Sequence, residues 1–302
     1  MLLYGKPVVE QLRQQTSAYI ATLKHKDMYI AHLLLNDDDA TRVYARLKAN
    51  YAASIGIHSQ THELRDASPE EVFAIIERCN TDDACVGIIV QLPVAERFAA
   101  QESEFLTAVT PHKDIDGLSG VVFGNSLIGK GTFVPATPRA VFEVLAHYGF
   151  GDLQWKTVAV ISQSNLIGKP VALELMNQWA TVLSCNERTS PARLAELCAM
   201  SDIIISATGV VHLITAEMFT RNALAHTGWS WVWVSSSWWS RAEKIIIDVG
   251  RWIKDGKAVW DTDRESLQAA GAHITPVPWG IWPVTIACVF DNIRVLQESQ
   301  QA

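Results

Sequence analysis

The chain has 302 residues, of which 49% are hydrophobic, and it carries a formal net charge of −7 at pH 7. A chain of this length and apolar content can bury two separate cores, whereas the acidic balance excludes the basic face typical of nucleic-acid-binding proteins. No uninterrupted apolar run of about 18 residues occurs in the sequence, so no membrane-spanning helix is expected.

The N-terminal segment and the cysteines favour a cytoplasmic protein. The segment becomes charged and polar too early for a secretory signal peptide. The five cysteines are odd in number and include no CxxC pair, which favours free thiols in a reducing compartment over disulfides or a zinc site. We therefore expect a cytoplasmic location, no metal site, and neither a membrane nor a nucleic acid as partner.

Strands and helices are predicted to alternate through the first half of the chain. Ser68 and Glu71 form the pattern of a capping box, which marks a helix start. Gly56 stands where a helix would end. From apolar periodicity we predict helices over 7–24, 41–54 and 68–80, and strands over 28–35 and 86–94.

The second half shows a similar alternation. Residues 167–170 open a helix with Pro170 early in its first turn, where a missing N–H costs nothing. We predict strands over 157–162, 181–185, 201–209 and 244–250, and helices from 167, over 190–200 and over 285–297. This order is typical of a doubly wound nucleotide-binding sheet, although the GxGxxG turn is missing.

These patterns predict an α/β protein of two domains, each with a mainly parallel sheet. The first domain is expected over 1–140, together with a C-terminal helix over 284–302 that returns to it. The second, a Rossmann-like dinucleotide-binding domain, is expected over 141–283.

Several short motifs are candidate functional sites, although each one alone is weak evidence. Tyr44 and Lys48 are four residues apart on a predicted helix and so share a face. A lysine on a helix is usually only a solvated charge. The sequence VQLP (90–93) can be an ordinary strand end, and HKDIDG (112–117) an ordinary acidic turn.

Taken together and in this order, the motifs resemble the bifunctional methylenetetrahydrofolate dehydrogenase/cyclohydrolase family. The resemblance covers almost the whole chain. It rests on Tyr44-x-x-x-Lys48, IIVQLP (88–93), KDIDG (113–117), PATP (135–138), IIIDVG (245–250) and TPVPWGIWP (275–283).

The resemblance implies two reactions of one-carbon metabolism: oxidation of 5,10-methylenetetrahydrofolate, and hydrolysis of the methenyl product to 10-formyltetrahydrofolate. It implies that Tyr44 stacks on the pterin ring and that Lys48 is the central catalytic group. Gln91 would hydrogen-bond and tune the lysine, and Asp116 would accept hydrogen bonds from the pterin. Tetrahydrofolate derivatives are thus the expected substrates, and a homodimer is the expected assembly.

The resemblance also places a nicotinamide dinucleotide in the second domain, with a loop that usually reads Gly-Arg-Ser. Here the loop is Ser162, Gln163 and Ser164. It therefore lacks the arginine that can bind a 2′-phosphate. Glu187 follows the next predicted strand, where an acid suits a free ribose 2′-OH. The resemblance adds Arg251 as a further cofactor-binding residue and implies NADP, the family's usual cofactor, or NAD. Gln163 and Glu187 favour NAD, and the alternative for Glu187 is an ordinary solvated side chain.

The C-terminal motif departs from the family's Pro-Gly-Gly-Val-Gly-Pro. Pro278 and Pro283, expected beside the substrate, remain, but Trp279 and Trp282 replace two glycines. Tryptophan would be strained there if the backbone takes a positive φ, and two indoles can fill ligand space. Residues 224–244, rich in tryptophan, are expected to be an insertion of about twenty residues in a usually short connection, as an exposed apolar patch or a surface hairpin.

These departures leave two alternatives to an active dehydrogenase/cyclohydrolase. One is a folate-binding scaffold, or a cyclohydrolase-only homologue with impaired dehydrogenase activity. The other is a two-domain dehydrogenase of the same architecture that acts on an amino acid or a hydroxy acid, against which VQLP and KDIDG (113–117) argue.

Overall fold

A computed structural model describes residues 1–23, 27–36, 38–219, 244–250, 252–254 and 257–301. The chain forms two compact units. The first unit comprises Val8–Arg139 and Thr285–Ala302, and the second comprises Met1–Pro7 and Ala140–Val284. Each contains a parallel sheet with helices, so the predicted two-domain α/β fold is confirmed.

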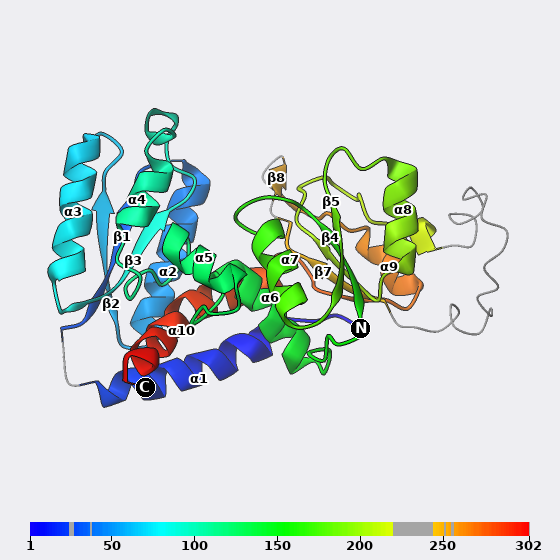
Figure 1. The fold of residues 1–302 in the computed structure, drawn as a ribbon, viewed down its shortest axis with the longest axis horizontal. Coiled ribbons are helices and arrows are strands. Elements are labelled where there is room, and N and C mark those ends of the chain that lie inside the picture. The colour runs from blue at the N-terminus through cyan, green and yellow to red at the C-terminus, as the bar shows by residue number, and fades with distance from the viewer. Residues whose placement is uncertain (24–26, 37, 220–243, 251, 255–256, 302) are drawn as a thin grey trace. The chain divides into compact units, whose positions relative to one another are not determined.

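The first unit is built on a three-stranded parallel sheet with strand order β2-β1-β3 (Figure 1). Its strands are β1 (Tyr29–Leu34), β2 (His58–Glu63) and β3 (Cys85–Gln91). Its helices are α2 (Asp39–Ser54), α3 (Pro69–Thr81), α4 (Glu102–Ala108) and α5 (Gly120–Leu127), with most of α1 (Lys6–Thr22), the start of α6 (Ala136–His147) and most of α10 (Ile281–Gln301). The polar strand β2 was not predicted.

The two faces of this sheet carry different side chains, because successive residues of a strand point to opposite sides. One face packs against α3 and α4 in a core that includes Ala31, Leu33, Val72, Ile76, Ile88, Val90 and Phe105. His32 and Gln91 belong to the other face, since they alternate with these apolar residues along β1 and β3. Two polar side chains are therefore buried on one face of an otherwise apolar sheet.

The predicted helix ends of the first unit are present. Ser68 and Glu71 form the capping box of α3, with both reciprocal hydrogen bonds. Gly56 follows α2 with a φ of +86°, a conformation that glycine adopts without steric cost. Helix α2 begins two residues before the predicted start, because the Asp38 side chain accepts a hydrogen bond from the backbone N–H of Thr41.

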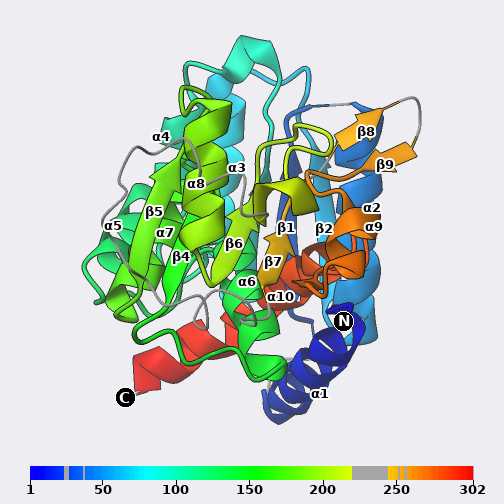
Figure 2. The same ribbon diagram turned by 90° about the vertical axis from the view of Figure 1, so that its right-hand side faces the viewer.

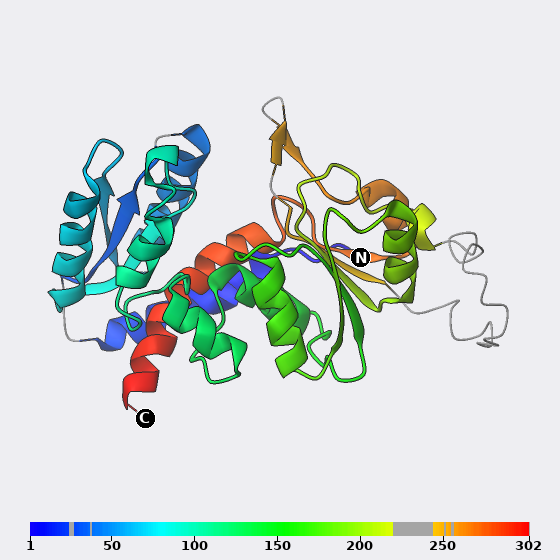
Figure 3. The ribbon, with the colours of Figure 1, turned by 45° about the horizontal axis from the view of Figure 1, so that its top comes forward.

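The second unit contains a five-stranded parallel sheet with strand order β10-β7-β6-β4-β5 (Figure 2). Its elements are β4 (Thr157–Ile161), α7 (Gly168–Asn177), β5 (Thr181–Cys185), α8 (Pro191–Met200), β6 (Ile203–Ser206), β7 (Ile245–Asp248), α9 (Arg264–Ala269) and β10 (His273–Ile274). An antiparallel pair, β8 (Trp252–Lys254) and β9 (Lys257–Val259), projects from the sheet (Figure 3).

The first residues of the chain belong to the second unit. The backbone N–H of Leu3 donates to the carbonyl of Ile274 at 2.8 Å, and that of Gly5 donates to the carbonyl of Trp279 at 2.8 Å. Helix α10 begins at Ile281, four residues before the predicted start. Within the part of the chain that the structure describes, no helix has the length and apolar character needed to cross a bilayer.

Two tryptophans occupy backbone positions that favour glycine. Trp155, before β4, has a φ of 65° and is 93% exposed, and Trp179, before β5, has a φ of 63° and is 80% exposed. A residue with a Cβ pays about 1–2 kcal/mol in the left-handed region. Because both indoles are solvated, little burial offsets this cost.

We predict that Trp155→Gly and Trp179→Gly each raise the free energy of unfolding by about 1 kcal/mol, since glycine removes the steric cost of the positive φ. Thermal unfolding followed by circular dichroism measures the change. The matched control is Gly149→Ala, also at a positive φ of 82°, where an added Cβ would have nothing within 4 Å. This variant should lower the unfolding midpoint. Lower midpoints for both tryptophan variants would contradict the argument.

Candidate functional site

A buried ion pair joins α2 to the loop after α4. The Lys48 ammonium lies 3.0 Å from Oδ2 of Asp116, and the two side chains are 3% and 18% exposed. An ammonium removed from water needs a counter-charge or several hydrogen bonds. Asp116 meets that need, and in the described part of the chain it is the one hydrogen-bond partner of the Lys48 side chain.

Tyr44 lies beside this pair. Its ring centroid is 5.2 Å from Nζ of Lys48, as expected for residues one helical turn apart. Tyr44 is 8% exposed and Lys48 is 2% exposed, so the solvated-lysine alternative does not apply. A cation over an aromatic face adds to the stabilisation of the buried charge.

The charged residues of the KDIDG motif make different contacts. The Lys113 ammonium donates to the carbonyls of Cys79, Asn80 and Asp82 at 2.7–2.9 Å and so closes the C-terminal end of α3. The motif's second aspartate, Asp116, is the member that reaches Lys48.

Asp114 shapes the loop on which Asp116 is carried. Its carboxylate accepts from the backbone N–H groups of Gly117, Leu118 and Ser119 at 2.9, 3.2 and 2.7 Å. Burial raises the pKa of Asp114, although the hydrogen bonds from Ser119 oppose this effect. The loop geometry therefore holds Asp116 toward α2 without using the Asp116 carboxylate itself.

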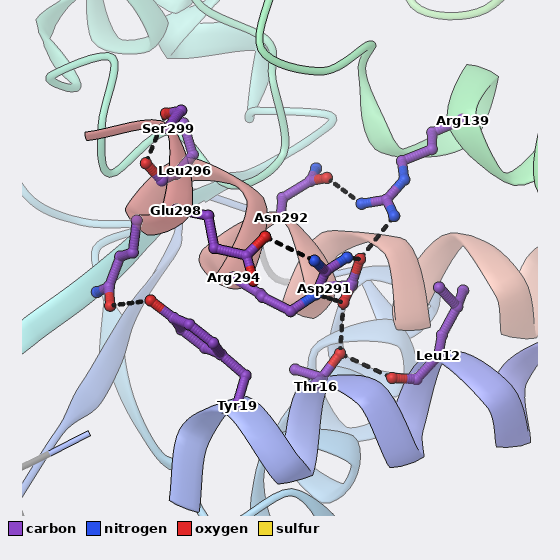
Figure 4. Close-up of polar contacts among 11 residues, drawn as sticks. Leu12, Thr16, Tyr19, Arg139, Asp291, Asn292, Arg294, Leu296, Glu298 and Ser299 are labelled. Carbon is purple, nitrogen blue, oxygen red and sulfur yellow. Dashed lines mark hydrogen bonds and ion pairs between the residues drawn. The ribbon is translucent and has the colours of Figure 1, made fainter. Parts of the chain in front are cut away.

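A second buried charge cluster surrounds Asp291 of the C-terminal helix (Figure 4). It also contacts this loop within the first unit. Asp291 of α10 accepts from Thr16 at 2.9 Å and from Arg139 at 2.6 Å. The neighbouring Asn292 accepts from Arg139 at 2.7 Å and donates to the carbonyl of Ile115 at 2.8 Å. Burial raises the pKa of Asp291, but hydrogen bonds from Arg294 and the charge of Arg139 outweigh it, so the pKa lies below its usual value.

Gln91 contacts a residue that the sequence analysis did not identify. Its Oε1 lies 3.1 Å from Nε2 of His32, and its Nε2 donates to the carbonyl of Leu92 at 2.8 Å. The expected hydrogen bond from Gln91 to Lys48 is not formed in the described part of the chain. A sequence signal for His32 existed: it is the one polar side chain inside the apolar strand 29–34.

The predicted cofactor loop of the second unit lies between β4 and α7, and its own Ser164 accepts hydrogen bonds from the start of the helix. Ser164 accepts at Oγ from the backbone N–H groups of Ile167 and Gly168, both at 3.2 Å, at the start of α7. A Cβ at Gly168 would lie 2.2 Å from the carbonyl oxygen of Ser162, so the turn accepts only glycine there. The carboxyl end of β4 and a helix N-terminus fit a dinucleotide.

Of the other predicted cofactor residues, Gln163 follows β4 and its side chain contacts residues at the end of β5, whereas Glu187 follows β5. Gln163 donates to Ser184 Oγ at 3.0 Å and accepts from the Asn186 amide at 2.8 Å. The Glu187 side chain is 84% exposed, and its carboxylate is 3.9 Å from the Arg188 guanidinium. Arg251 lies outside the described residues.

The C-terminal motif has no positive φ at its tryptophans. In the described chain the non-glycine residues with positive φ are Trp155, Trp179 and His212, so Trp279 and Trp282 are not strained in this way. The Trp279 indole is 65% exposed. The whole motif belongs to the second unit, whereas Lys48 and Asp116 belong to the first.

The IIIDVG motif brings two buried carboxylates together. Asp248 accepts from Gly250 and Thr262, and Asp261 accepts from Ser206 and Thr208. A Cβ at Gly250 would lie 2.4 Å from Oδ1 of Asp261 and 3.0 Å from Oδ1 of Asp248, so both carboxylates face the same space. Burial, followed by the charge of Asp261, raises the pKa of Asp248 to about 7.

Two sequence models of one family match the chain. The model described as the tetrahydrofolate dehydrogenase/cyclohydrolase catalytic domain matches residues 3–116. The model described as the NAD(P)-binding domain of the same family matches residues 135–226 and 233–301. Only residues 227–232 are left unmatched inside the second model, so the insertion relative to the family is shorter than the predicted 224–244. Its structure lies outside the described residues.

Full-length proteins match as well. The bifunctional protein FolD of Halalkalibacterium halodurans is 33% identical over 295 residues, which cover 97% of this chain and 96% of that protein. FolD of Leuconostoc mesenteroides is 33% identical over 305 residues, with 99% of each chain covered. The crystal structure of the bifunctional enzyme FolD from Campylobacter jejuni is similar with a TM-score of 0.85, at 29% identity and with 99% of each chain covered.

We predict that the free energy of unfolding decreases as the pH rises, because of Asp248. A carboxyl whose folded pKa of about 7 exceeds its unfolded value holds its proton longer in the folded state. Its contribution to the unfolding free energy is complete below about pH 4 and is lost as the pH rises through about 7. Thermal midpoints measured from pH 4 to 8 should reveal this decline.

The informative variant is Asp261→Asn, because an amide can donate to Asp248 where the native carboxylate repels it. We expect the variant to have a flatter profile over this pH range and a higher midpoint than the unmodified protein at pH 8. Asp152→Asn, at an exposed acid of the same unit, is the control and should leave the slope unchanged. Parallel profiles for all three proteins would refute the coupling.

Proposed function

The chain belongs to the tetrahydrofolate dehydrogenase/cyclohydrolase family, and we propose that its buried Lys48–Asp116 pair is the centre of both reactions. These are the oxidation of 5,10-methylenetetrahydrofolate with NAD(P) and the hydrolysis of 5,10-methenyltetrahydrofolate to 10-formyltetrahydrofolate. The observation that carries the proposal is an ammonium 3.0 Å from a carboxylate, with the lysine side chain 3% exposed and a tyrosine ring beside it.

The hydrolysis needs proton transfer that the Lys48 ammonium is placed to supply. Water adds to the methenyl carbon and loses a proton. The resulting hydroxyl group then gives up its proton and becomes the formyl C=O as the bond from that carbon to N5 breaks. N5 takes the electron pair of that bond and a proton, so one proton is released overall. A buried amine that exchanges a proton with the reacting atoms serves as general acid and base for this sequence.

Asp116 can hold Lys48 and bind the pterin at the same time. Only Oδ2 contacts the ammonium, whereas a carboxylate has lone pairs for several donors. The amino and ring N–H groups of the pterin are donors of the kind that a carboxylate pairs with. Tyr44 supplies an aromatic face next to the pair, which suits a stacked ring.

We assign the nicotinamide dinucleotide to the loop of Ser162, Gln163 and Ser164 in the second unit. The cofactor, when bound, accepts the hydride from the methylene carbon. The pyrophosphate would lie at the start of α7, where it would replace Ser164 Oγ as the acceptor for the N–H groups of Ile167 and Gly168. The ribose would lie near the end of β5. Gln163 fixes the side chains at that strand end through Ser184 and Asn186, next to Glu187.

We propose that NAD is preferred over NADP. An exposed carboxylate at Glu187 accepts from a ribose 2′-OH and repels a 2′-phosphate, and its neighbour Arg188 is partly neutralised by the same carboxylate 3.9 Å away. Gln163 stands where the family has an arginine, so a 2′-phosphate has one cation fewer to bind.

Two expectations from the sequence remain predictions. A homodimer follows from the family resemblance and the commonness of two-fold assemblies. A cytoplasmic location is supported by cysteines that are all free and buried, namely Cys79, Cys85, Cys185, Cys198 and Cys288.

We predict that Lys48→Met lowers kcat for methenyltetrahydrofolate hydrolysis by about 100-fold or more, because the general acid and base is lost while the side-chain volume is kept. Loss of methenyl absorbance measures the rate, and fluorescence titration with folate confirms a folded pocket. Lys130→Met removes an exposed lysine of the same unit and should retain the original rate. Unchanged hydrolysis and oxidation in Lys48→Met would disprove the assignment.

We predict that Glu187→Ser raises kcat/KM for NADP relative to NAD by about tenfold, since it removes the repulsion of a 2′-phosphate. Oxidation of methylenetetrahydrofolate with each cofactor gives the ratio. The control Glu265→Ser removes another exposed acid of the second unit. A preference for NADP in the unmodified protein would overturn the assignment to NAD, and hydrolysis without oxidation would favour the cyclohydrolase-only alternative.

A further inference from the structure

His32 is a buried, uncharged hydrogen-bond donor on the same face of the sheet as Gln91. The residue is 0% exposed, and its Nε2 lies 3.1 Å from Oε1 of Gln91. An amide oxygen only accepts hydrogen bonds, so the proton must sit on Nε2. In the described structure the other ring nitrogen, Nδ1, is buried and has no hydrogen-bond partner.

The geometry of the sheet explains why these two residues meet. His32 pairs with Ile89 in the parallel register of β1 and β3, and Gln91 is two residues farther along β3, on the same face as Ile89. Diagonal neighbours at this offset are within reach of long side chains. The contact is therefore set by backbone register and does not depend on a loop.

The charge state of His32 is also defined by its surroundings. Burial and the Lys48 ammonium lower the pKa of His32 to about 4, although the hydrogen bond to Gln91 and the charge of Asp116 act in the opposite direction. The imidazole is neutral near pH 7. It thus supplies an N–H donor beside Lys48 without adding a second positive charge.

We propose that His32 is a positioning residue for the cyclohydrolase step, which acts by holding the amide of Gln91 in one orientation. This inference rests on the proposed function. The terminal torsion of glutamine is broad, and the Leu92 carbonyl, which accepts from Nε2 at 2.8 Å, restrains only the NH2 group of the amide. The N–H of His32 restrains Oε1, so the two contacts together define one orientation of the amide.

The orientation matters because an amide oxygen has two lone pairs. With one of them occupied by His32, the other remains available to the Lys48 ammonium or to the attacking water as the proton moves. Loss of the His32 donor is therefore expected to slow the proton transfer more than it weakens substrate binding.

The test compares three variants of the full-length chain. His32→Leu removes the donor, and His32→Gln returns an N–H at the Nε2 position. His62→Leu removes a partly buried histidine from the other face of the same sheet. We expect His32→Leu to lower kcat for hydrolysis by about tenfold with KM within about twofold, because the lost interaction acts on the transition state.

Two further results are required by the proposal. His32→Gln should recover most of the lost kcat, and His62→Leu should keep the original kcat. In addition, the losses from His32→Leu and Gln91→Leu should not add in the double variant, since both act through one amide. Thermal midpoints identify a variant that is unfolded under the assay conditions.

Other outcomes overturn the role. An unchanged kcat in His32→Leu, equal losses in His32→Leu and His32→Gln, or additive losses in the double variant would each show that His32 does not act through Gln91. If the unmodified protein does not hydrolyse the substrate, the proposed function is rejected, and this role for His32 is rejected with it. If the unmodified protein is active and only the variant results disagree, the role of His32 alone is rejected.

Discussion

Burial of the Lys48 ammonium is the constraint on which the candidate site depends. A positive charge with a side chain 3% exposed is stable only beside a counter-charge, and the structure provides one at 3.0 Å. Helix α2 has to present Lys48, and the loop after α4 has to present Asp116. The same burial gives the amine a chemical use, because a charge that is shielded from water interacts strongly with whatever enters the site.

Much of the first unit serves to hold the loop that carries Asp116. Lys113 fastens it to the end of α3, Asp114 accepts three of its backbone N–H groups, and Asn292 donates to the carbonyl of Ile115. Arg139 in turn donates to both Asp291 and Asn292 of α10 and so fixes the Asn292 side chain. Lys113, Asp114 and Arg139 therefore stabilise the loop, whereas Asp116 pairs with Lys48.

In the second unit the buried charges have the same sign, in contrast to the ion pair of the first unit. Asp248 and Asp261 face each other across Gly250 with hydroxyl and N–H donors around them, so one carboxyl keeps its proton to a higher pH than usual. Ser164 occupies the start of α7, where a dinucleotide phosphate is expected. Trp155 and Trp179 adopt the backbone of glycine at the two neighbouring strand starts, which shows that this fold tolerates tryptophan at such turns at some cost in stability.

The sequence by itself determined the alternation of strands and helices, the capping box of α3 and the motifs that identify the family, because these depend on local patterns of apolar, capping and turn residues. It did not reveal β2, whose polar residues His58–Glu63 lie at a sheet edge and lack an apolar period. Only the tertiary structure decided that Lys48 pairs with Asp116 and Gln91 with His32. Those partners are 68 and 59 residues apart, and strand register and loop hydrogen bonds, which no local pattern encodes, bring them together.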